Sequence, residues 1–507
     1  MTPPLPTELV IGVDVGTTAA KVAAFGLGSP WRLVALREYP LLEPLPGQQV
    51  QDPAVILEAV LEALAEVAAA VQGAHVLGLS VSTAMHGLVG LDADARPLTP
   101  LLTWADARSS AEAAALRASG EAREIHELTG TPVHPMTPLT KLRWFAHHEP
   151  ATAARVRTWA GLKDLVLHLL TGSLVTELSS ASATALLDRR SRRWSERATA
   201  LAGVSLDQLP QILSPTATLP LAPGLAARVG LPAGTPVVVG AADGPLGNLG
   251  TGALAPGVVG LSLGTSGAAR MVVPTPPEHL DPSLFCYALT EDHWVLGGAV
   301  SNGGLVVRWA GSALAPDLGG DDAALLALAA QVPPGSEGLV MVPYLLAERA
   351  PLWDPEVPGA YLGLRRAHSR AHLVRAAVEG VALQLGVLVD RLDAITPVTC
   401  VRATGGVFRD PLWREVLAAV LDRPLVTVGA AEGSALGAAA LGLFALGRAE
   451  SLDGALALLA PPESAEPEPV PADPELLAAY AELRSRVPRL VDSLSAVGGL
   501  FEPPDAP

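Results

Sequence analysis

The chain has only two cysteines, Cys286 and Cys400, among 507 residues. Two cysteines give neither a disulfide framework nor the ligand spacing of a zinc site, so we expect a reduced, cytoplasmic setting. The first ten residues lack the positive start and apolar run of a secretion signal. The most apolar later stretch, residues 434–447, is too short to span a bilayer, so we expect no membrane association.

Positive charge is scarce as well. The only lysines are Lys21, Lys141 and Lys163, and the net charge is −17, which argues against a nucleic-acid-binding protein. A chain of 507 residues exceeds what one hydrophobic core usually fills, and half of its residues are hydrophobic. We therefore expect two or more domains that act on a small molecule.

The first part of the chain alternates between strand and helix patterns. Residues 9–15 and 19–25 are two apolar runs joined by a short turn, which predicts a hairpin. A helix begins at Asp52-Pro53, where Asp is a good N-cap and Pro fits the first helical position. An apolar strand at 76–81 follows. This alternation is typical of an α/β layer fold.

The turn of the predicted hairpin carries polar chemistry. Gly16 is expected to adopt a positive φ, and Thr17 and Thr18 then offer N–H groups and hydroxyls in one place. Such a row of donors suits a phosphate, and the nearby Asp14 suits a Mg²⁺ ion held through water. An ordinary hairpin turn that happens to contain Gly and Thr is the alternative.

The same pattern recurs near the middle of the chain. GLSLGTSGA at 260–268 aligns with GVDVGTTAA at 12–20, so that Gly264, Thr265 and Ser266 repeat the first turn. The spacing is about half of the chain, which indicates a duplicated domain. Ser262 replaces Asp14 in the second copy, so only the first copy keeps the carboxylate that suits a metal.

Two further strand ends are candidates for the same site. Asp243 follows an apolar strand at 237–240, where it could accept a proton from an attacking hydroxyl during phosphoryl transfer. It could equally cap a helix that begins at Pro245. Gly405 and Gly406 follow a strand at 398–403 and could let the backbone approach a nucleotide, although a tight turn explains them as well.

A second set of residues has the types that a polyol requires. His86, Trp104 and Asp106 supply a polar ring, an apolar wall and a bidentate acceptor, and Arg108 could pair with a substrate carboxylate. Residues 129–138, which include His134, contain three prolines and suit a stiff pocket wall. A core Trp, a His at a strand end and a surface Asp–Arg pair are the alternatives.

In this order, over about residues 8 to 450, the motifs resemble the FGGY family of carbohydrate kinases, which belongs to the actin-like ATPase superfold. The likeness is strongest to bacterial gluconokinases. The segments that carry it are STAMHG (82–87), TWADARS (103–109), TGTPVHPMTPLTKLRW (129–144), FCYALTEDHWVLGGAVSNGGLVVRW (285–309), AERAPLWDP (347–355) and EGSALGAAALG (432–442).

The resemblance implies an α/β fold of two ribonuclease-H-like lobes, in which mixed sheets are flanked by helices and the active site lies in the interlobe cleft. We assign residues 1–252 to an N-terminal lobe on the sugar and phosphate side. Residues 253–460 form a C-terminal lobe on the nucleotide side, and 461–507 a Pro/Glu-rich connector with a terminal helix.

The resemblance also implies the site residues. Asp243 would be the catalytic base, and Asp14 and Asp243 would lie at Mg²⁺. The residues expected at ATP are Asp14, Gly16, Thr17, Thr18, Lys21, Gly264, Thr265, Ser266, Gly304, Arg308, Gly405, Gly406 and Asp410. Those expected at the sugar are Met85, His86, Trp104, Asp106, Arg108, His134 and Asp243.

The predicted function is ATP- and Mg²⁺-dependent phosphorylation of D-gluconate to 6-phospho-D-gluconate. A xylulokinase is the nearest alternative, because Met85-His86-Gly87 also resembles that branch. An actin- or chaperone-like ATPase would share the two turns without a base beside a polyol pocket. A sugar-sensing pseudokinase is disfavoured because Asp14, Thr17 and Asp243 are all present. A homodimer is a possible assembly.

Overall fold

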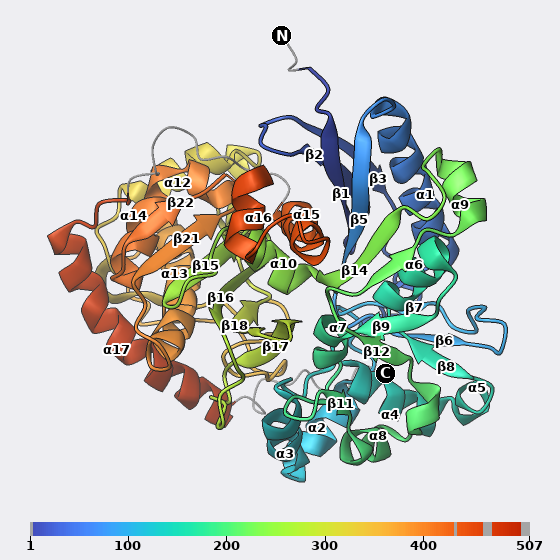
Figure 1. The fold of residues 1–507 in the computed structure, drawn as a ribbon. Helices are drawn as coiled ribbons and strands as arrows, with labels where there is room; N and C mark the ends of the chain where they lie inside the picture. Colours follow the sequence, from blue (N-terminus) through green and yellow to red (C-terminus); the bar gives the residue numbers. More distant parts are fainter. Residues whose placement is uncertain (1–3, 430–432, 460–468, 498–507) are drawn as a thin grey trace.

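The computed structural model of the chain describes residues 4–429, 433–459 and 469–497. Two lobes lie side by side, and each is built around a six-stranded mixed sheet that is flanked by helices (Figure 1). The predicted fold class is therefore confirmed.

The sheet of the first lobe has the strand order β13-β14-β5-β1-β2-β3. β1 and β2 are antiparallel and form the predicted hairpin, β2 is antiparallel to β3, and β5 runs parallel to both β1 and β14. The strands are β1 (Glu8–Val15), β2 (Ala19–Gly26), β3 (Arg32–Glu38), β5 (His75–Thr83), β13 (Thr218–Pro220) and β14 (Pro236–Ala242).

Five strands of the second sheet, whose order is β17-β18-β16-β15-β21-β22, repeat this topology, and the sixth, β17, lies beyond β18 at the edge opposite to that of β13. β15 and β16 form the second hairpin, β16 is antiparallel to β18, and β21 runs parallel to both β15 and β22. The predicted duplication is thus visible strand by strand. The strands are β15 (Val258–Leu263), β16 (Gly267–Val273), β17 (Phe285–Thr290), β18 (His293–Val300), β21 (Cys400–Thr404) and β22 (Leu425–Thr427).

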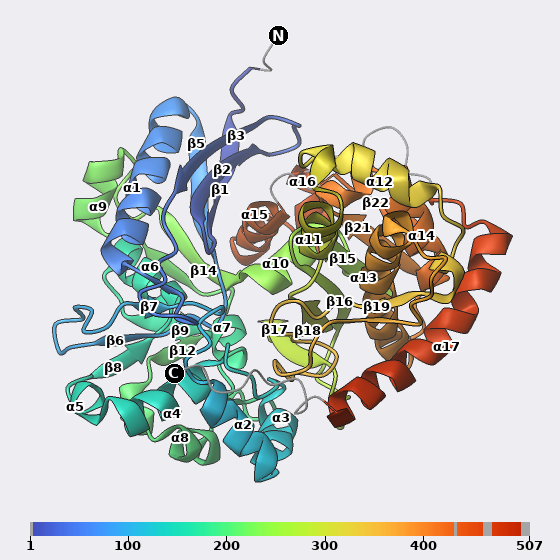
Figure 2. The ribbon, with the colours of Figure 1, turned by 180° about the vertical axis from the view of Figure 1, so that it is seen from behind.

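A long insertion between β5 and β14 sets the first lobe apart from the second. Most of it forms the lower part of that lobe in Figures 1 and 2, whereas its last helix packs on the helix of residues 53–70 higher up, and it supplies much of one wall of the site described below. Its helices are α2 (Ser110–Ala118), α3 (Glu121–Thr129), α4 (Pro138–His148), α5 (Pro150–Ala153), α6 (Leu162–Thr171), α7 (Leu178–Ser182), α8 (Glu196–Ala202) and α9 (Pro223–Val229).

Short strand pairs complete the architecture. They are β4 (Val50–Gln51) with β7 (Leu101–Leu102), β6 (Val89–Leu91) with β8 (Thr158–Ala160), β9 (Val175–Glu177) with β12 (Gln211–Leu213), β10 (Leu187–Asp188) with β11 (Arg193–Trp194), and β19 (Val340–Val342) with β20 (Ala360–Leu362).

The remaining helices include the one predicted at Asp52-Pro53. It is α1 (Pro53–Ala70), and the Asp52 carboxylate accepts a hydrogen bond of 2.9 Å from the N–H of Ala54, as an N-cap should. The others are α10 (Asp243–Gly250), α11 (Gly304–Leu314), α12 (Asp322–Ala330), α13 (Arg370–Asp393), α14 (Pro411–Leu421), α15 (Gly433–Ala445), α16 (Leu452–Leu459) and α17 (Pro474–Val497).

The conformation predicted for Gly16 is wrong. None of Gly16, Thr17 and Thr18 has a positive φ. The three-residue turn closes instead through the N–H of Gly16, which donates to the carbonyl oxygen of Ala19 at 2.9 Å. The second turn closes in a similar way, from the N–H of Gly264 to the carbonyl oxygen of Ser266 at 2.8 Å.

Helix α13 is the one described helix that is long and apolar enough to cross a membrane by length and composition. However, 83% of its most apolar window is buried, so it is better explained as a core helix of the second lobe. α17, the predicted terminal helix, packs on α13 and α14. Residues 461–468 of the predicted connector lie outside the described residues.

Glycines allow two helices to cross closely between the lobes. A Cβ added to Gly437 in α15 would lie 1.9 Å from the carbonyl oxygen of Leu246 in α10, and one added to Gly250 would lie 2.0 Å from that of Gly433. α15 also packs on β1, where a Cβ at Gly12 would lie 2.2 Å from the carbonyl oxygen of Ala435. The small-residue run of α15 is therefore required by this crossing.

We expect Gly437→Ala to lower the free energy of unfolding by about 1–3 kcal/mol, because the new methyl group overlaps a backbone carbonyl that cannot easily move. Gly224→Ala is the matched control, since Gly224 is also helical but has open space at its Cβ position. Better helix propensity should stabilise the control by up to about 1 kcal/mol. Thermal unfolding of both variants checks this, and equal melting temperatures would contradict the close crossing.

Candidate active site

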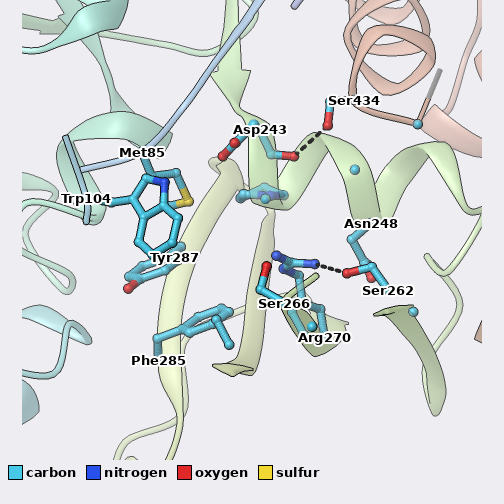
Figure 3. A pocket seen from close by; sticks show the side chains of 18 of the residues that line it. Met85, Trp104, Asp243, Asn248, Ser262, Ser266, Arg270, Phe285, Tyr287 and Ser434 are labelled. Carbon is cyan, nitrogen blue, oxygen red and sulfur yellow. Dashed lines mark hydrogen bonds between the residues drawn. The ribbon is translucent and has the colours of Figure 1, made fainter. Parts of the chain in front are cut away.

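A cavity of about 500 Å³ lies between the two lobes and is called the central cavity here. Residues of both sheets and of helix α10 line it, and Figure 3 shows their side chains converging on it. The predicted site residues that it brings together are Asp14, Thr17, Lys21, Met85, His86, Trp104, Asp243 and Ser266.

Asp14 is one of two partly buried carboxylates at this cavity. It stands near the end of β1 opposite Lys21 of β2, and its Oδ1 accepts a hydrogen bond of 2.7 Å from the Ser82 hydroxyl. Burial raises the pKa of Asp14, and the Ser82 hydrogen bond and the lysines Lys21 and Lys163 oppose this rise. The ionised Asp14 carboxylate therefore carries a free-energy cost, which a bound cation would reduce.

Asp243 is the second carboxylate. It is the first residue of α10, Ala242 holds the N-cap position, and no side-chain cap is formed. The alternative that Asp243 caps a helix at Pro245 is therefore wrong. Burial raises the pKa of Asp243 to about 6, the charge of Asp14 adds to the rise, and Arg270 and Lys163 oppose it. A carboxyl group with this pKa can exchange a proton near neutral pH.

The Lys163 ammonium lies beneath these carboxylates and was not predicted from the sequence. Its Nζ donates to the carbonyl oxygens of Val239 and Ala241, each at 3.0 Å, and to that of Val81. It therefore joins the carboxyl ends of β5 and β14. Burial lowers the pKa of Lys163 to about 8, whereas the surrounding carboxylates raise it. In the sequence it stands beside Asp164, and nothing there distinguishes it from a surface lysine.

The carboxylate pair fits a magnesium ion. The described residues contain no cluster of three His, Cys, Asp or Glu side chains that could cage a metal. Magnesium, however, usually keeps several waters and binds through one or two carboxylates together with substrate phosphates. Asp14 and Asp243, both facing one cavity between two turns rich in N–H groups, are a donor set of that kind.

The wall of the central cavity in the first lobe is built from the insertion and the end of β5. Trp104 Nε1 donates to Thr17 Oγ1 at 3.0 Å, which ties this wall to the first turn. His86 Nδ1 lies 2.8 Å from the carbonyl oxygen of Ala183, so it carries the proton and leaves Nε2 as an acceptor. Burial lowers the pKa of His86 to about 3, which keeps the ring neutral.

Some predicted sugar residues are not among those that line the central cavity. Asp106 is fully buried, and its carboxylate pairs with Arg108 through bonds of 2.8 and 3.0 Å and accepts the N–H of Gln49 at 2.9 Å. The Arg108 guanidinium also stacks on Trp144. Because Asp106 already neutralises its charge, Arg108 does not need a substrate carboxylate as a partner. The pair is buried, which also contradicts the alternative of a surface pair. His134 is buried beside Trp353, and its Nδ1 accepts the N–H of Met136.

A second cavity of about 560 Å³ lies on the outer side of the second turn. It brings together six residues predicted at the nucleotide: Gly264, Thr265, Gly304, Arg308, Gly406 and Asp410. Arg308 donates to Thr265 Oγ1 at 2.7 Å, and the Asp410 carboxylate caps α14. Because Ser266 of the same turn lines the central cavity, the turn lies between the two spaces.

Three predicted nucleotide residues line neither cavity. Gly16 is next to Thr17 and accepts the Tyr39 hydroxyl at 2.6 Å through its carbonyl oxygen. Thr18 is exposed. Gly405 has a φ of +131°, and a Cβ there would lie 1.9 Å from the carbonyl oxygen of Leu263, so this position requires glycine.

The second lobe supplies cavity residues that were not singled out from the sequence. Arg270 and Arg349 are the two charged ones, and Phe285, Tyr287 and Trp353 are the large aromatic ones. The segments around 285 and 347–355 carried the family resemblance, which was the only signal for them. No such signal marked Arg270, which lies in β16 beyond the turn.

Comparison with known proteins identifies related chains. Residues 9–250 match the N-terminal domain, and residues 259–446 the C-terminal domain, of the FGGY family of carbohydrate kinases. A gluconokinase from Bacillus subtilis is 36% identical over 460 residues, which cover 88% of this chain and 89% of the relative. Two solved structures from Lactobacillus acidophilus, a gluconate kinase and a ligand-bound xylulose kinase, each superpose with a TM-score of 0.91 at 31% identity, covering 98% of this chain and 100% of theirs.

The raised pKa of Asp243 predicts that its carboxylate destabilises the fold at neutral pH. Because the folded-state pKa is about 6 and the usual value is 3.8, the folded protein gains stability from this group only at low pH and loses it as the pH rises through 6. We therefore expect Asp243→Asn to be more stable than the wild type at pH 7.5, by about 2–3 kcal/mol.

This advantage should shrink as the pH falls from 6 towards 4. Melting temperatures at pH 7.5 and pH 5 measure it, with exposed Asp453→Asn as a control that should change stability by less than about 0.5 kcal/mol. An Asp243→Asn protein that melts lower at pH 7.5 would contradict the account of its burial.

Proposed function

This chain belongs to the FGGY family of carbohydrate kinases, and within that family we propose that it phosphorylates D-gluconate to 6-phospho-D-gluconate. Like other kinases of this kind it uses ATP as the phosphate donor. The name of the Bacillus subtilis relative supports gluconate as the acceptor. The observation that carries the proposed chemistry is the position of Asp243, a buried carboxylate with a raised pKa that faces a cavity bounded by two donor-rich turns.

In the proposed reaction Asp243 is the catalytic base. Its carboxylate accepts the proton of the terminal hydroxyl while that oxygen forms a bond to the γ-phosphorus of ATP. The bond between the γ-phosphorus and the bridging oxygen breaks, and ADP leaves. His86, Met85 and Trp104 would hold the polyol so that this hydroxyl points at Asp243.

Groups of the first lobe and of the two turns would neutralise the negative charge of the ATP phosphates. Asp14 and Asp243 would hold Mg²⁺, which when bound neutralises phosphate charge. N–H groups of the two turns, together with Lys21, would bind phosphate oxygens. The second cavity would hold the nucleoside, with Gly406 and Asp410 at its edge. Closure of the lobes would exclude water, which otherwise competes as the acceptor.

We also propose the division into lobes at residues 1–252 and 253–460, with 461–507 as an appended segment. The two family matches, which end at 250 and begin at 259, support the first boundary. Xylulose is the second candidate acceptor, and it is supported by the likeness to a ligand-bound xylulose kinase structure, which equals the likeness to the gluconate kinase structure.

A panel of sugars in a coupled assay for ADP release tests the acceptor. We expect D-gluconate to be turned over with a kcat/KM at least about 100-fold above that of D-xylulose, because a site built for one set of polar groups rejects analogues that leave them unpaired. Glycerol serves as a further acceptor in the panel. Turnover of xylulose without turnover of gluconate would overturn the proposed substrate.

Replacement of Asp243 by Asn tests the base. Loss of proton acceptance should lower kcat by about 10²–10⁴-fold, with a smaller effect on KM. In the wild type, kcat/KM should fall as the pH drops below about 6, because the base is then protonated. Asp453→Asn, an exposed control far along the chain, should leave both quantities unchanged. An Asp243→Asn enzyme with a near wild-type kcat would refute the assignment.

A further inference from the structure

Two partly buried arginines of the second lobe, Arg270 and Arg349, face the central cavity. Arg270 comes from β16 and Arg349 from the segment between β19 and β20, and both line the cavity. The charge of Asp243 acts on both guanidinium groups, but neither group is within ion-pair distance of an Asp or Glu side chain in the part of the chain that the structure describes. Two like charges that face one cavity without a direct ion pair call for an anion between them.

Arg270 is held from one side only. Its Nη1 donates to Ser262 Oγ at 3.3 Å, and this is its one side-chain hydrogen bond within the described residues (Figure 3). The other edge of the guanidinium faces the start of α10, where a Cβ added to Gly244 would lie 3.5 Å from both Nε and Nη2. Burial lowers the pKa of Arg270 to about 10, the charge of Asp243 opposes this fall, and the charge of Arg349 adds to it.

The Arg349 guanidinium is held by two hydrogen bonds, which leave its Nη1 for a ligand. Its Nε donates to Ser301 Oγ at 3.2 Å and its Nη2 to the carbonyl oxygen of Val300 at 3.0 Å, whereas Nη1 has no partner among the described residues. The guanidinium stacks on Trp104, 4.8 Å from the ring centroid. Its neighbour Glu348 is occupied by the N–H of Ser301 and the amide of Asn302.

We propose that Arg270 and Arg349 form an anion subsite that binds the carboxylate of a sugar acid while its far hydroxyl faces Asp243. This subsite rests on the proposed function, because it assumes a sugar acid as the acceptor. Arg108, which the sequence suggested for this role, and the buried Lys141 are not available for it. Arg108 is already paired with Asp106, and Lys141 donates to the carbonyl oxygens of His86, Thr103 and Met136.

A transferred phosphoryl group is the other anion that could reach these arginines. The carboxylate is favoured because Arg349 stacks on Trp104, the wall expected to hold the polyol, rather than on either turn. The turns and Lys21 already provide donors for phosphate oxygens. The two sources differ in one measurable respect, since only a carboxylate site distinguishes a sugar acid from its neutral amide.

The experiment compares D-gluconate with D-gluconamide, which has the same chain of hydroxyls but no charge, as acceptors for the full-length wild type. We expect kcat/KM to favour gluconate by about 100-fold, as for a buried charge pair that loses one partner. Arg270→Gln and Arg349→Gln should each reduce this preference to less than about 10-fold, mainly by weakening turnover of gluconate. Arg270→Lys, which keeps the charge but not the planar fork, should retain part of it.

Arg308→Gln is the matched control, because Arg308 lies at the second cavity and contacts Thr265. It should lower kcat/KM for both acceptors by the same factor and leave the preference unchanged. If Arg270→Gln and Arg349→Gln behave in the same way, the arginines serve the phosphoryl group and the proposal is overturned.

The wild type alone also decides the question, so the proposal does not depend on the folding of any variant. Equal turnover of gluconate and gluconamide would overturn the carboxylate subsite while leaving the proposed function intact. Failure of the wild type to phosphorylate gluconate at all would instead overturn the proposed function, and with it this subsite.

Discussion

The burial of two carboxylates at the meeting point of two sheets is the constraint on which the site depends. Asp14 and Asp243 share one cavity, where burial raises the pKa of both and the charge of Asp14 raises that of Asp243 further. Lys163 offsets part of this cost from below, where it also joins the carboxyl ends of β5 and β14. Carboxylates that are costly to ionise can accept a proton and can also bind a cation. The free-energy cost of placing them at the cavity is therefore linked to the chemistry of the site.

The two copies of the duplicated hairpin bring different polar side chains to the central cavity. The position of Asp14 in the first copy corresponds to Ser262 in the second, and Ser262 contacts Arg270. The first lobe therefore brings carboxylates to the cavity and the second lobe brings guanidinium groups. A substrate that carries an anionic group and a reactive hydroxyl is matched by this asymmetry, whereas two identical lobes would not distinguish its ends.

The connection between the lobes depends on small residues. α10 begins at Asp243 and crosses α15 so closely that Gly437 and Gly250 have no room for a Cβ. α15 in turn packs on β1, the strand that carries Asp14. The elements that hold both carboxylates thus contact one helix, which couples the geometry of the pair to the packing between the lobes.

The sequence by itself determined the α/β alternation, the duplicated hairpin, the helix at Asp52-Pro53 and the residue types around both turns, because these follow from local periodicity and turn chemistry, whereas the two-lobed fold was implied by the family resemblance of its motifs. It did not determine which polar residues reach the cavity. Asp106 and Arg108 have the right types but neutralise each other, whereas Arg270, Arg349 and Lys163 became candidates only when the two sheets were brought together. Pairing between side chains far apart in the chain is decided by tertiary packing, and no local pattern contains it.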